Sequence, residues 1–213
     1  NRKIISHDQI PDSARAATLA AEDDNFYNHF GIDIFGILRA IRVNFGTNSI
    51  SQGGSTITQQ LAKNVFLTPE KSWQRKLKEI ILAFKIEKKY SKDEILDFYL
   101  NQVPYGSNAY GIQSAAEIYF GKDAKDLNID EAALLAALTK ATSYYSPYGK
   151  NKDKLRDRQK IIIRKIGELA NMKEELINQY LEVDTFSKLK PYRESIDAPH
   201  FVFYVRDQLE KQL

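Results

Sequence analysis

Residues 130–141 read Asp-Glu-Ala-Ala-Leu-Leu-Ala-Ala-Leu-Thr-Lys-Ala, and this run decides the fold. A helix formed by these residues is apolar on nearly every face, so it has no surface suited to water. Such a helix belongs in the interior of a protein, with other elements packed around it. The run therefore predicts a buried core helix, preceded by Asp130 and reaching Ala141.

Further helices are predicted on both sides of this run. Each follows a residue that can cap a helix N-terminus, or repeats apolar residues every three or four positions. They begin at Asp12 or Ser13, at Asp33, at Ser72 and at a capping box formed by Ser91 and Glu94, and others cover 155–169, 173–181 and the segment after Pro199. Strand-like alternation is scarce and no internal repeat is present. The pattern predicts a mainly α fold.

Three stretches lack this apolar periodicity. Residues 46–54 are rich in Gly, Ser and Asn, which is typical of a loop. Residues 104–111 predict a structured turn between helices, and 188–199 a linker-like stretch before the last segment.

The composition fits a folded domain. The chain has 213 residues, 43% of them hydrophobic and 28% charged, which is enough for one large core or two lobes and argues against disorder. It has no cysteine, so disulfides, thiolate nucleophiles and cysteine-ligated metals are excluded. No apolar stretch approaches the roughly 20 residues that span a bilayer. Since the chain starts abruptly at Asn1 and stops inside a helix-like run, we expect it to be a piece of a longer protein.

Positive charge is concentrated in one segment. Between residues 63 and 92 there are nine Lys or Arg and three Glu, a balance of +6, whereas the net charge of the whole chain is +3. This asymmetry indicates a polyanionic partner such as phosphates, nucleic acid or an anionic membrane. Lysines that merely solvate helix faces would explain it equally well.

An acidic triplet, Glu22-Asp23-Asp24, stands where the first predicted helix ends, and Phe26, His29 and Gly31 follow it. Carboxylates at a helix C-terminus are unfavourable, because the helix dipole prefers cations there. A locally unfavourable placement often marks function. The alternative is an acidic, solvated helix end.

A hydroxyl- and amide-rich run follows, reading Gly-Ser-Thr-Ile-Thr-Gln-Gln-Leu-Ala-Lys-Asn over 54–64. With Ser55 as a plausible N-cap, the helix start offers backbone N–H groups to an anion, and Lys63 adds a point charge. An ordinary capped helix with a polar face is the alternative. Further on, Arg75, Lys76 and Glu79 can share one helix face. They form either a surface ion pair or a carboxylate held beside two cations, ready for a pyrophosphate or a metal.

Taken together, the three motifs resemble the first three signature motifs of the peptidoglycan glycosyltransferases. This is the glycan-polymerising domain of class A penicillin-binding proteins and monofunctional transglycosylases. The resemblance continues in order through residues 95–97, 99–101, 106, 110–111, 115–116, 119–121, 134–136, 140, 146–147 and 158–166. Asp97 and Thr142 depart from it, standing where Glu and Pro are usual. Ser187 and Lys190 imitate a transpeptidase motif, but no Lys-Thr-Gly run accompanies them, so we expect no transpeptidase domain in this chain.

The resemblance implies a role for each matching residue. Glu22 would be the catalytic base, and Glu79 a second carboxylate near the donor diphosphate that orients cations or binds Mg²⁺ or Mn²⁺. The remaining residues would bind substrate or support the site: Asp23, His29, Ser55, Thr56, Thr58, Gln60, Lys63, Asn64, Arg75, Lys76 and Lys140.

The resemblance also implies a reaction and a location. The domain would join lipid II units to a growing lipid-linked strand, releasing undecaprenyl pyrophosphate with inversion at the donor sugar, and would bind phosphoglycolipid inhibitors such as moenomycin. It would act at the extracytoplasmic face of the bacterial inner membrane, anchored by a transmembrane helix not present here. A two-lobed, lysozyme-like α fold over 1–213 is expected, with a small jaw lobe at about 55–100. Phe66 and Trp73 would face the membrane there, although a plain buried core would also use them.

Two other functions compete with this one. A lytic enzyme of lysozyme type also needs one catalytic Glu, but a hydrolase acting on neutral glycan has no pyrophosphate for Lys63, Arg75 and Lys76 to hold. A basic module that binds anionic lipid or nucleic acid would suit 63–92, yet it leaves the acidic triplet without a role, and no nucleic-acid motif is recognised. The sequence favours the glycosyltransferase.

Overall fold

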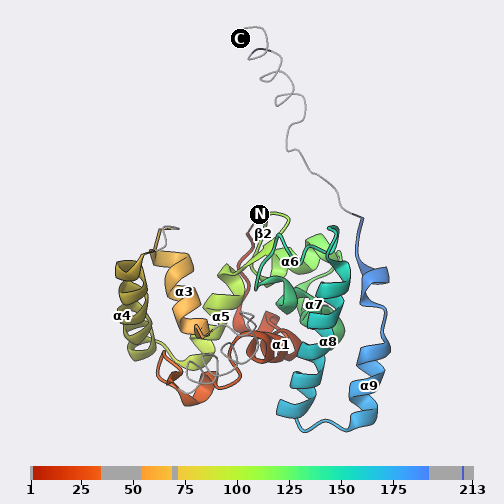
Figure 1. Ribbon diagram of the computed structural model, residues 1–213, viewed down its shortest axis with the longest axis horizontal. Coiled ribbons are helices and arrows are strands. Elements are labelled where there is room, and N and C mark those ends of the chain that lie inside the picture. The colour runs from red at the N-terminus through yellow and green to blue at the C-terminus, as the bar shows by residue number, and fades with distance from the viewer. Residues whose placement is uncertain (1, 35–53, 69–71, 192–207, 209–213) are drawn as a thin grey trace.

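The computed structural model describes residues 2–34, 54–68, 72–191 and 208. Helices dominate these ranges, and two short antiparallel strands pair between α5 and α6 (Figure 1). The elements are α1 (Asp12–Glu22), α3 (Ile57–Phe66), α4 (Trp73–Lys89), α5 (Lys92–Gln102), β1 (Pro104–Gly106), β2 (Ala109–Tyr110), α6 (Ile112–Tyr119), α7 (Ile129–Leu138), α8 (Lys152–Leu169) and α9 (Glu174–Glu182), with 3-10 turns at His7–Gln9, Phe26–Asn28, Ala124–Asp126 and Thr185–Lys188. The mainly α prediction is confirmed.

The predicted core helix is α7, and every residue from Asp130 to Leu138 is buried. It packs against α1 and α8, which supply apolar faces to the same core. Its ends differ from the prediction. Asn128 takes the N-cap position in a capping box with Glu131, so Asp130 lies inside the first turn. The helix stops at Leu138 rather than Ala141, where the Thr139 hydroxyl lies 2.8 Å from the carbonyl oxygen of Ala136.

The elements separate into two groups (Figure 1). One group holds α3 and α4, which pack against each other, and the other holds α6, α7, α8 and α9. Between them lie α5, which packs against α3, and α1, which packs against α7 and α8. The N-terminal end of α3 and the C-terminal ends of α1 and α7 are thereby brought toward one region. This grouping accords with the expected two lobes, while the lobe boundaries near 55 and 100 stay a prediction.

Two of the predicted helix starts are confirmed. The Ser72 hydroxyl accepts the Arg75 N–H, and Ser91 and Glu94 form their capping box. The starts of α1 and α3 differ from the prediction. Pro11 holds the N-cap position of α1, which begins at Asp12, and the Ser13 hydroxyl donates to the carbonyl oxygen of Leu127 at 2.7 Å. Thr56, not Ser55, caps α3, since its side chain accepts the Gln59 N–H.

The turn predicted at 104–111 is the β1–β2 hairpin. Its two loop residues, Ser107 and Asn108, both have positive φ values of 48° and 58°, which match the twist of the paired strands. The predicted helices at 155–169 and 173–181 correspond to α8 and α9. The helix expected after Asp33, most of the 46–54 loop and the segment after Pro199 lie outside the described residues. No helix within the described ranges is long and apolar enough to cross a membrane.

Candidate active site

Glu22 is the last residue of α1, and three elements converge on its carboxylate. Gln60 of α3 donates an amide N–H to Oε2 at 2.7 Å, and the Thr139 hydroxyl lies 2.6 Å from Oε1. Arg158 of α8 approaches the same Oε1 to 3.8 Å. The side chain is only 12% exposed. Glu22 is therefore held in one orientation by neutral donors on both oxygens, with the Arg158 guanidinium nearby.

The other two carboxylates of the triplet are each paired with a different element. Asp23 is buried; it accepts a hydrogen bond from His29 Nε2 at 2.9 Å and another from the Ile57 N–H at 3.0 Å. Because Ile57 is the first residue of α3, Asp23 lies at the positive end of that helix. Asp24 pairs with Lys165 of α8 at 2.9 Å. The interpretation of the triplet as a solvated acidic helix end is wrong for Glu22 and Asp23.

The His29 ring is oriented by this pairing. Its Nε2 faces both carboxylate oxygens of Asp23, and its side chain is 5% exposed. Gly31, two residues further, has φ +82° and accepts the Thr56 hydroxyl proton through its carbonyl oxygen at 2.7 Å. The segment after α1 is thus fastened to the start of α3. The supporting role of Asp23 and His29 in the site stays a prediction.

Two of the predicted hydroxyl ligands are buried. Thr58 donates to Glu87 Oε1 at 2.5 Å, and Glu87 also pairs with Lys92 at 2.8 Å. The Thr56 hydroxyl proton is engaged by Gly31, as described above. Both threonines hold α3 against its surroundings in this structure. Their direct contact with substrate stays a prediction.

A second cluster of charges lies on α4. Lys76 donates to the Ser55 hydroxyl at 3.0 Å and pairs with Glu79, whose side chain is 5% exposed. Arg75, one residue before Lys76, is half-buried. The predicted shared face of Lys76 and Glu79 is confirmed by this pair, and the burial of Glu79 distinguishes the pair from an ordinary surface salt bridge.

Helix α3 connects the two clusters. Gln60 contacts Glu22, and Ser55, just before the helix, contacts Lys76. The two contacts are five residues apart along the chain, so the base candidate and the α4 cations lie at two ends of one short polar segment. Lys63 is half-buried and Asn64 exposed on the following turn.

Lys140 follows the end of α7 and is exposed. Partial burial of its amine lowers its pKa, the nearby Arg158 lowers it further, and Glu22 opposes both effects. The electrostatic influence of Glu22 and Arg158 places Lys140 beside the carboxylate end of the site.

Several residues around Glu22 were given no role in the site by the sequence, although Tyr99 and Arg158 belong to stretches that carry the family resemblance. The buried Tyr99 of α5 donates its hydroxyl to Gln60 Oε1 at 3.2 Å. Burial raises the pKa of Tyr99, and Glu22 raises it further; the same two causes act on Tyr105. Tyr99, Thr139 and Arg158 lie 77, 117 and 136 residues after Glu22 in the sequence. Only the folded arrangement brings them together.

The donor set for a metal can be assessed among the described residues. No group of three or more His, Asp or Glu side chains converges there. Glu79 offers one carboxylate, already paired with Lys76. Mg²⁺ in phosphate-handling enzymes is typically held by one or two carboxylates plus substrate phosphate oxygens. Glu79 could therefore contribute one ligand to a cation that arrives with a diphosphate, but the described residues do not form a complete cage.

Comparison with known proteins gives consistent results. A family model described as transglycosylase matches residues 1–167. Penicillin-binding protein 1A of Aquifex aeolicus is 47% identical over 192 residues, which is 89% of this chain and 26% of that protein. Penicillin-binding protein 1F of Bacillus subtilis is 48% identical over 157 residues, covering 72% and 22% respectively. The chain thus spans about a quarter of the length of these relatives.

A solved structure is also similar. The crystal structure of penicillin-binding protein 1A from Haemophilus influenzae matches 74% of this chain and 20% of that one, with a TM-score of 0.45 and 23% identity.

Proposed function

Because the chain belongs to the transglycosylase family, we propose that it polymerises lipid II into peptidoglycan glycan strands, with Glu22 as the base. The observation that carries this proposal is the setting of Glu22, whose two oxygens accept from Gln60 and Thr139 while Arg158 stays 3.8 Å away. An ionised carboxylate has about four acceptor positions. Two remain for a substrate hydroxyl, so the group is oriented yet still able to take a proton.

The proposed reaction follows from this arrangement. The 4-hydroxyl of the acceptor sugar attacks C1 of the lipid-linked donor sugar, and its proton passes to Glu22. The bond from C1 to the diphosphate oxygen breaks with its electron pair, so undecaprenyl pyrophosphate leaves and the configuration at C1 inverts. General-base assistance of this kind contributes about 10²–10⁴-fold to rate.

The leaving diphosphate needs positive charge at the Ser55 end of the polar segment 55–60, opposite the Gln60 end where Glu22 lies. Lys76 lies there beside Ser55, with Arg75 on the same helix and Lys63 on α3. These cations would stabilise the negative charge as it develops. A divalent cation, where one takes part, would use Glu79 with diphosphate oxygens, and would neutralise the same charge.

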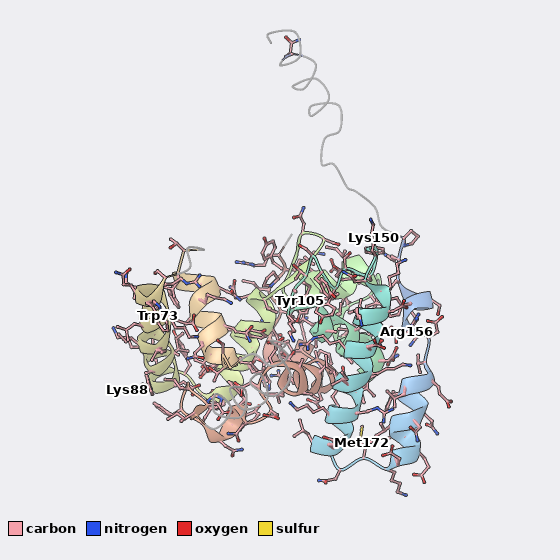
Figure 2. The ribbon with its side chains drawn as sticks, viewed as in Figure 1. Trp73, Lys88, Tyr105, Lys150, Arg156 and Met172 are labelled. Carbon is pink, nitrogen blue, oxygen red and sulfur yellow. The ribbon has the colours of Figure 1, made fainter. Side chains whose placement is uncertain are left out.

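The outer face of α4 supports action at a membrane surface. Trp73, Leu77, Ile81 and Phe84 are 91%, 59%, 47% and 43% exposed, at spacings that align them on one side of the helix. Figure 2 shows Trp73 and Lys88 on this outer helix. The alternative of a plain buried core is wrong for Trp73 and for Phe66, which is 60% exposed. An apolar stripe flanked by lysines suits the bilayer interface. We place its action at the extracytoplasmic face of the bacterial inner membrane, where lipid II and the growing strand are held, and expect the parent protein to be anchored there.

The direct test is conversion of labelled lipid II to polymer on a gel, using Glu22→Gln. Glutamine keeps the shape and can still meet Thr139 and Gln60, so the variant should fold as the wild type does. We expect the rate to fall about 10²–10⁴-fold. Glu175→Gln, the same change at an exposed position of α9, is the matched control and should polymerise normally. Near-normal polymer from Glu22→Gln would remove Glu22 from the mechanism.

The rival functions are separated by parallel incubations. Cleavage of purified peptidoglycan without extension of lipid II would identify a lytic enzyme. Retention on anionic vesicles that a lipid II competitor leaves unaffected, together with no polymer, would identify a binding module. Inhibition of polymerisation by moenomycin would support a diphosphate-lipid site, and repeating the assay with and without Mg²⁺ tests the role of Glu79.

A further inference from the structure

Thr139 lies where the end of α7 meets the end of α1. Its Oγ1 is 2.6 Å from Glu22 Oε1 and 2.8 Å from the carbonyl oxygen of Ala136. Both of these are acceptors when Glu22 is ionised. A hydroxyl has one proton and two lone pairs. Thr139 can therefore donate its proton to only one of these two oxygens at a time. Which oxygen accepts it depends on whether Glu22 is ionised or protonated.

The two contacts suit one position of the hydroxyl proton in each protonation state of Glu22. A charge-assisted O–H···O⁻ bond measures about 2.5–2.7 Å, so the 2.6 Å contact matches donation from Thr139 to ionised Glu22. Once Oε1 carries a proton, Glu22 becomes the donor. The hydroxyl then turns its own proton to Ala136, 2.8 Å away. Both states are satisfied by rotation of one hydroxyl, and no heavy atom has to move.

Among the residues that the structure describes, the opposite oxygen of Glu22 has no such partner. Oε2 faces the Gln60 amide nitrogen, which donates and cannot accept. The orientation of that amide is set by its other end, because Gln60 Oε1 accepts the Tyr99 hydroxyl. Of the neighbours in the described part of the chain that are hydrogen-bonded to Glu22, Gln60 and Thr139, Thr139 is therefore the one that can receive a proton from it.

We propose that Thr139 is a positioning residue that holds Glu22 in one orientation while its carboxylate gains and loses a proton. This inference rests on the proposed function in one respect, that Glu22 takes the proton of the acceptor hydroxyl. The proton moves from the sugar oxygen to Glu22 as the new C–O bond forms, and solvent removes it before the next turnover.

Other groups that face Glu22 could also affect its titration. They are Arg158 on α8 at 3.8 Å, Lys140 after α7, Tyr99 on α5, Tyr105 on β1 and the neighbouring Asp23. Tyr99 also forms a side-chain hydrogen bond with Thr139, which Thr139→Val and Thr139→Ala both remove and Thr139→Ser keeps, whereas the other groups are unchanged by a substitution at residue 139. A comparison among variants at that one position therefore isolates the contribution of the hydroxyl.

Thr139→Val tests the proposal because it removes the hydroxyl and keeps the branched shape. The carboxyl titration of Glu22 is followed by NMR with ¹³C-labelled glutamate, the Glu22→Gln spectrum identifying its resonance. We expect the midpoint to move to higher pH by roughly 0.5–1 unit, since a hydrogen bond to a charged acceptor is worth more than one to a neutral acceptor. In Thr139→Ser the Glu22 carboxyl should have the same titration midpoint as in the wild type, because serine keeps the hydroxyl. Thr139→Ala removes the hydroxyl with a smaller side chain and repeats the test.

Polymerisation gives the second readout. A shift of that size makes the valine variant roughly three- to tenfold slower at a fixed pH on the acidic limb of the rate profile. Thr142→Val is the control, because it removes a hydroxyl three residues further along the same segment. The Thr142 side chain lies against Gly106. Thr142→Val should change neither the NMR titration midpoint of Glu22 nor the midpoint of the acidic limb of the rate profile.

The outcomes are distinct. If Thr139 only closes the last turn of α7, the valine and alanine variants will lose stability while both midpoints stay in place, and the proposal is overturned. If the midpoint moves but no lipid II is polymerised by the wild type, the contact between Thr139 and Glu22 stands and the proposed reaction fails.

Discussion

Replacing Asp23 should destabilise the protein far more than replacing its neighbour Asp24. The side chain of Asp23 is 3% exposed and bonds both His29 and the first N–H of α3. In Asp23→Ala a buried imidazole and a buried backbone N–H lose their acceptor, which costs about 3–5 kcal/mol for a broken buried pair. For a chain of this size, 1 kcal/mol corresponds to roughly 2–4 °C in Tm. The expected fall is therefore about 6–20 °C.

Asp24→Ala is the matched comparison. Its partner Lys165 is 34% exposed, and Asp24 itself 24%, so solvent screens much of the attraction between them. Exposed pairs contribute about 0–1 kcal/mol, which corresponds to less than about 4 °C. Asp23→Asn should fall between the two, because its amide oxygen can still accept the Ile57 N–H. Calorimetric melts at neutral pH measure all three variants. Equal losses from Asp23→Ala and Asp24→Ala would refute the buried connection between α1 and α3.

Two further predictions concern titration. The Tyr27 hydroxyl donates to Asp93 at 2.8 Å, and burial together with that bond raises its pKa to about 12. The folded state thus keeps a proton that the unfolded chain releases near pH 10, so the stabilisation is complete below pH 10 and is lost between pH 10 and 12. The stability difference between wild type and Tyr27→Phe in urea melts should shrink over that range; a constant difference would contradict this. Lys140, whose pKa is lowered, should react with a limiting acylating reagent at pH 8–9 faster than the exposed Lys150, as judged by mass spectrometry. Arg158→Met should slow that labelling, since Arg158 is one cause of the shift.

Local sequence was sufficient for most of the fold. Capping residues such as Ser72 and Ser91 act within one helical turn, so their positions could be predicted from spacing alone. Ser13 and Ser55 look equally suitable, but their hydroxyls contact Leu127 and Lys76 instead. Those partners are 114 and 21 residues away. Distant contacts of this kind decide which of two adjacent candidates becomes the cap.

For the site, too, only some of the residues could be predicted from local sequence. Glu22, Gln60 and Glu79 stood out because motifs surround them, and the structure brings Glu22 and Gln60 into contact. Thr139 lies at a buried helix end and Arg158 on a long amphipathic helix. Arg158 begins a stretch that carries the family resemblance, but neither residue was assigned to the site from the sequence. Their importance depends on where α7 and α8 point, which no local pattern encodes.

The position of Glu22 also shows why its surroundings matter for function. Glu22 ends α1, and Thr139, its hydrogen-bond partner, caps the C-terminus of α7. Two helix C-termini, each carrying partial negative charge, therefore meet at one carboxylate. A carboxylate needed only for stability would gain nothing there. The arrangement is tolerable because Arg158 supplies positive charge at 3.8 Å and two neutral donors occupy the oxygens. Gln60 and Thr139 each occupy one acceptor position of Glu22, so acceptor positions remain on the carboxylate for a substrate hydroxyl, which is what the proposed chemistry requires.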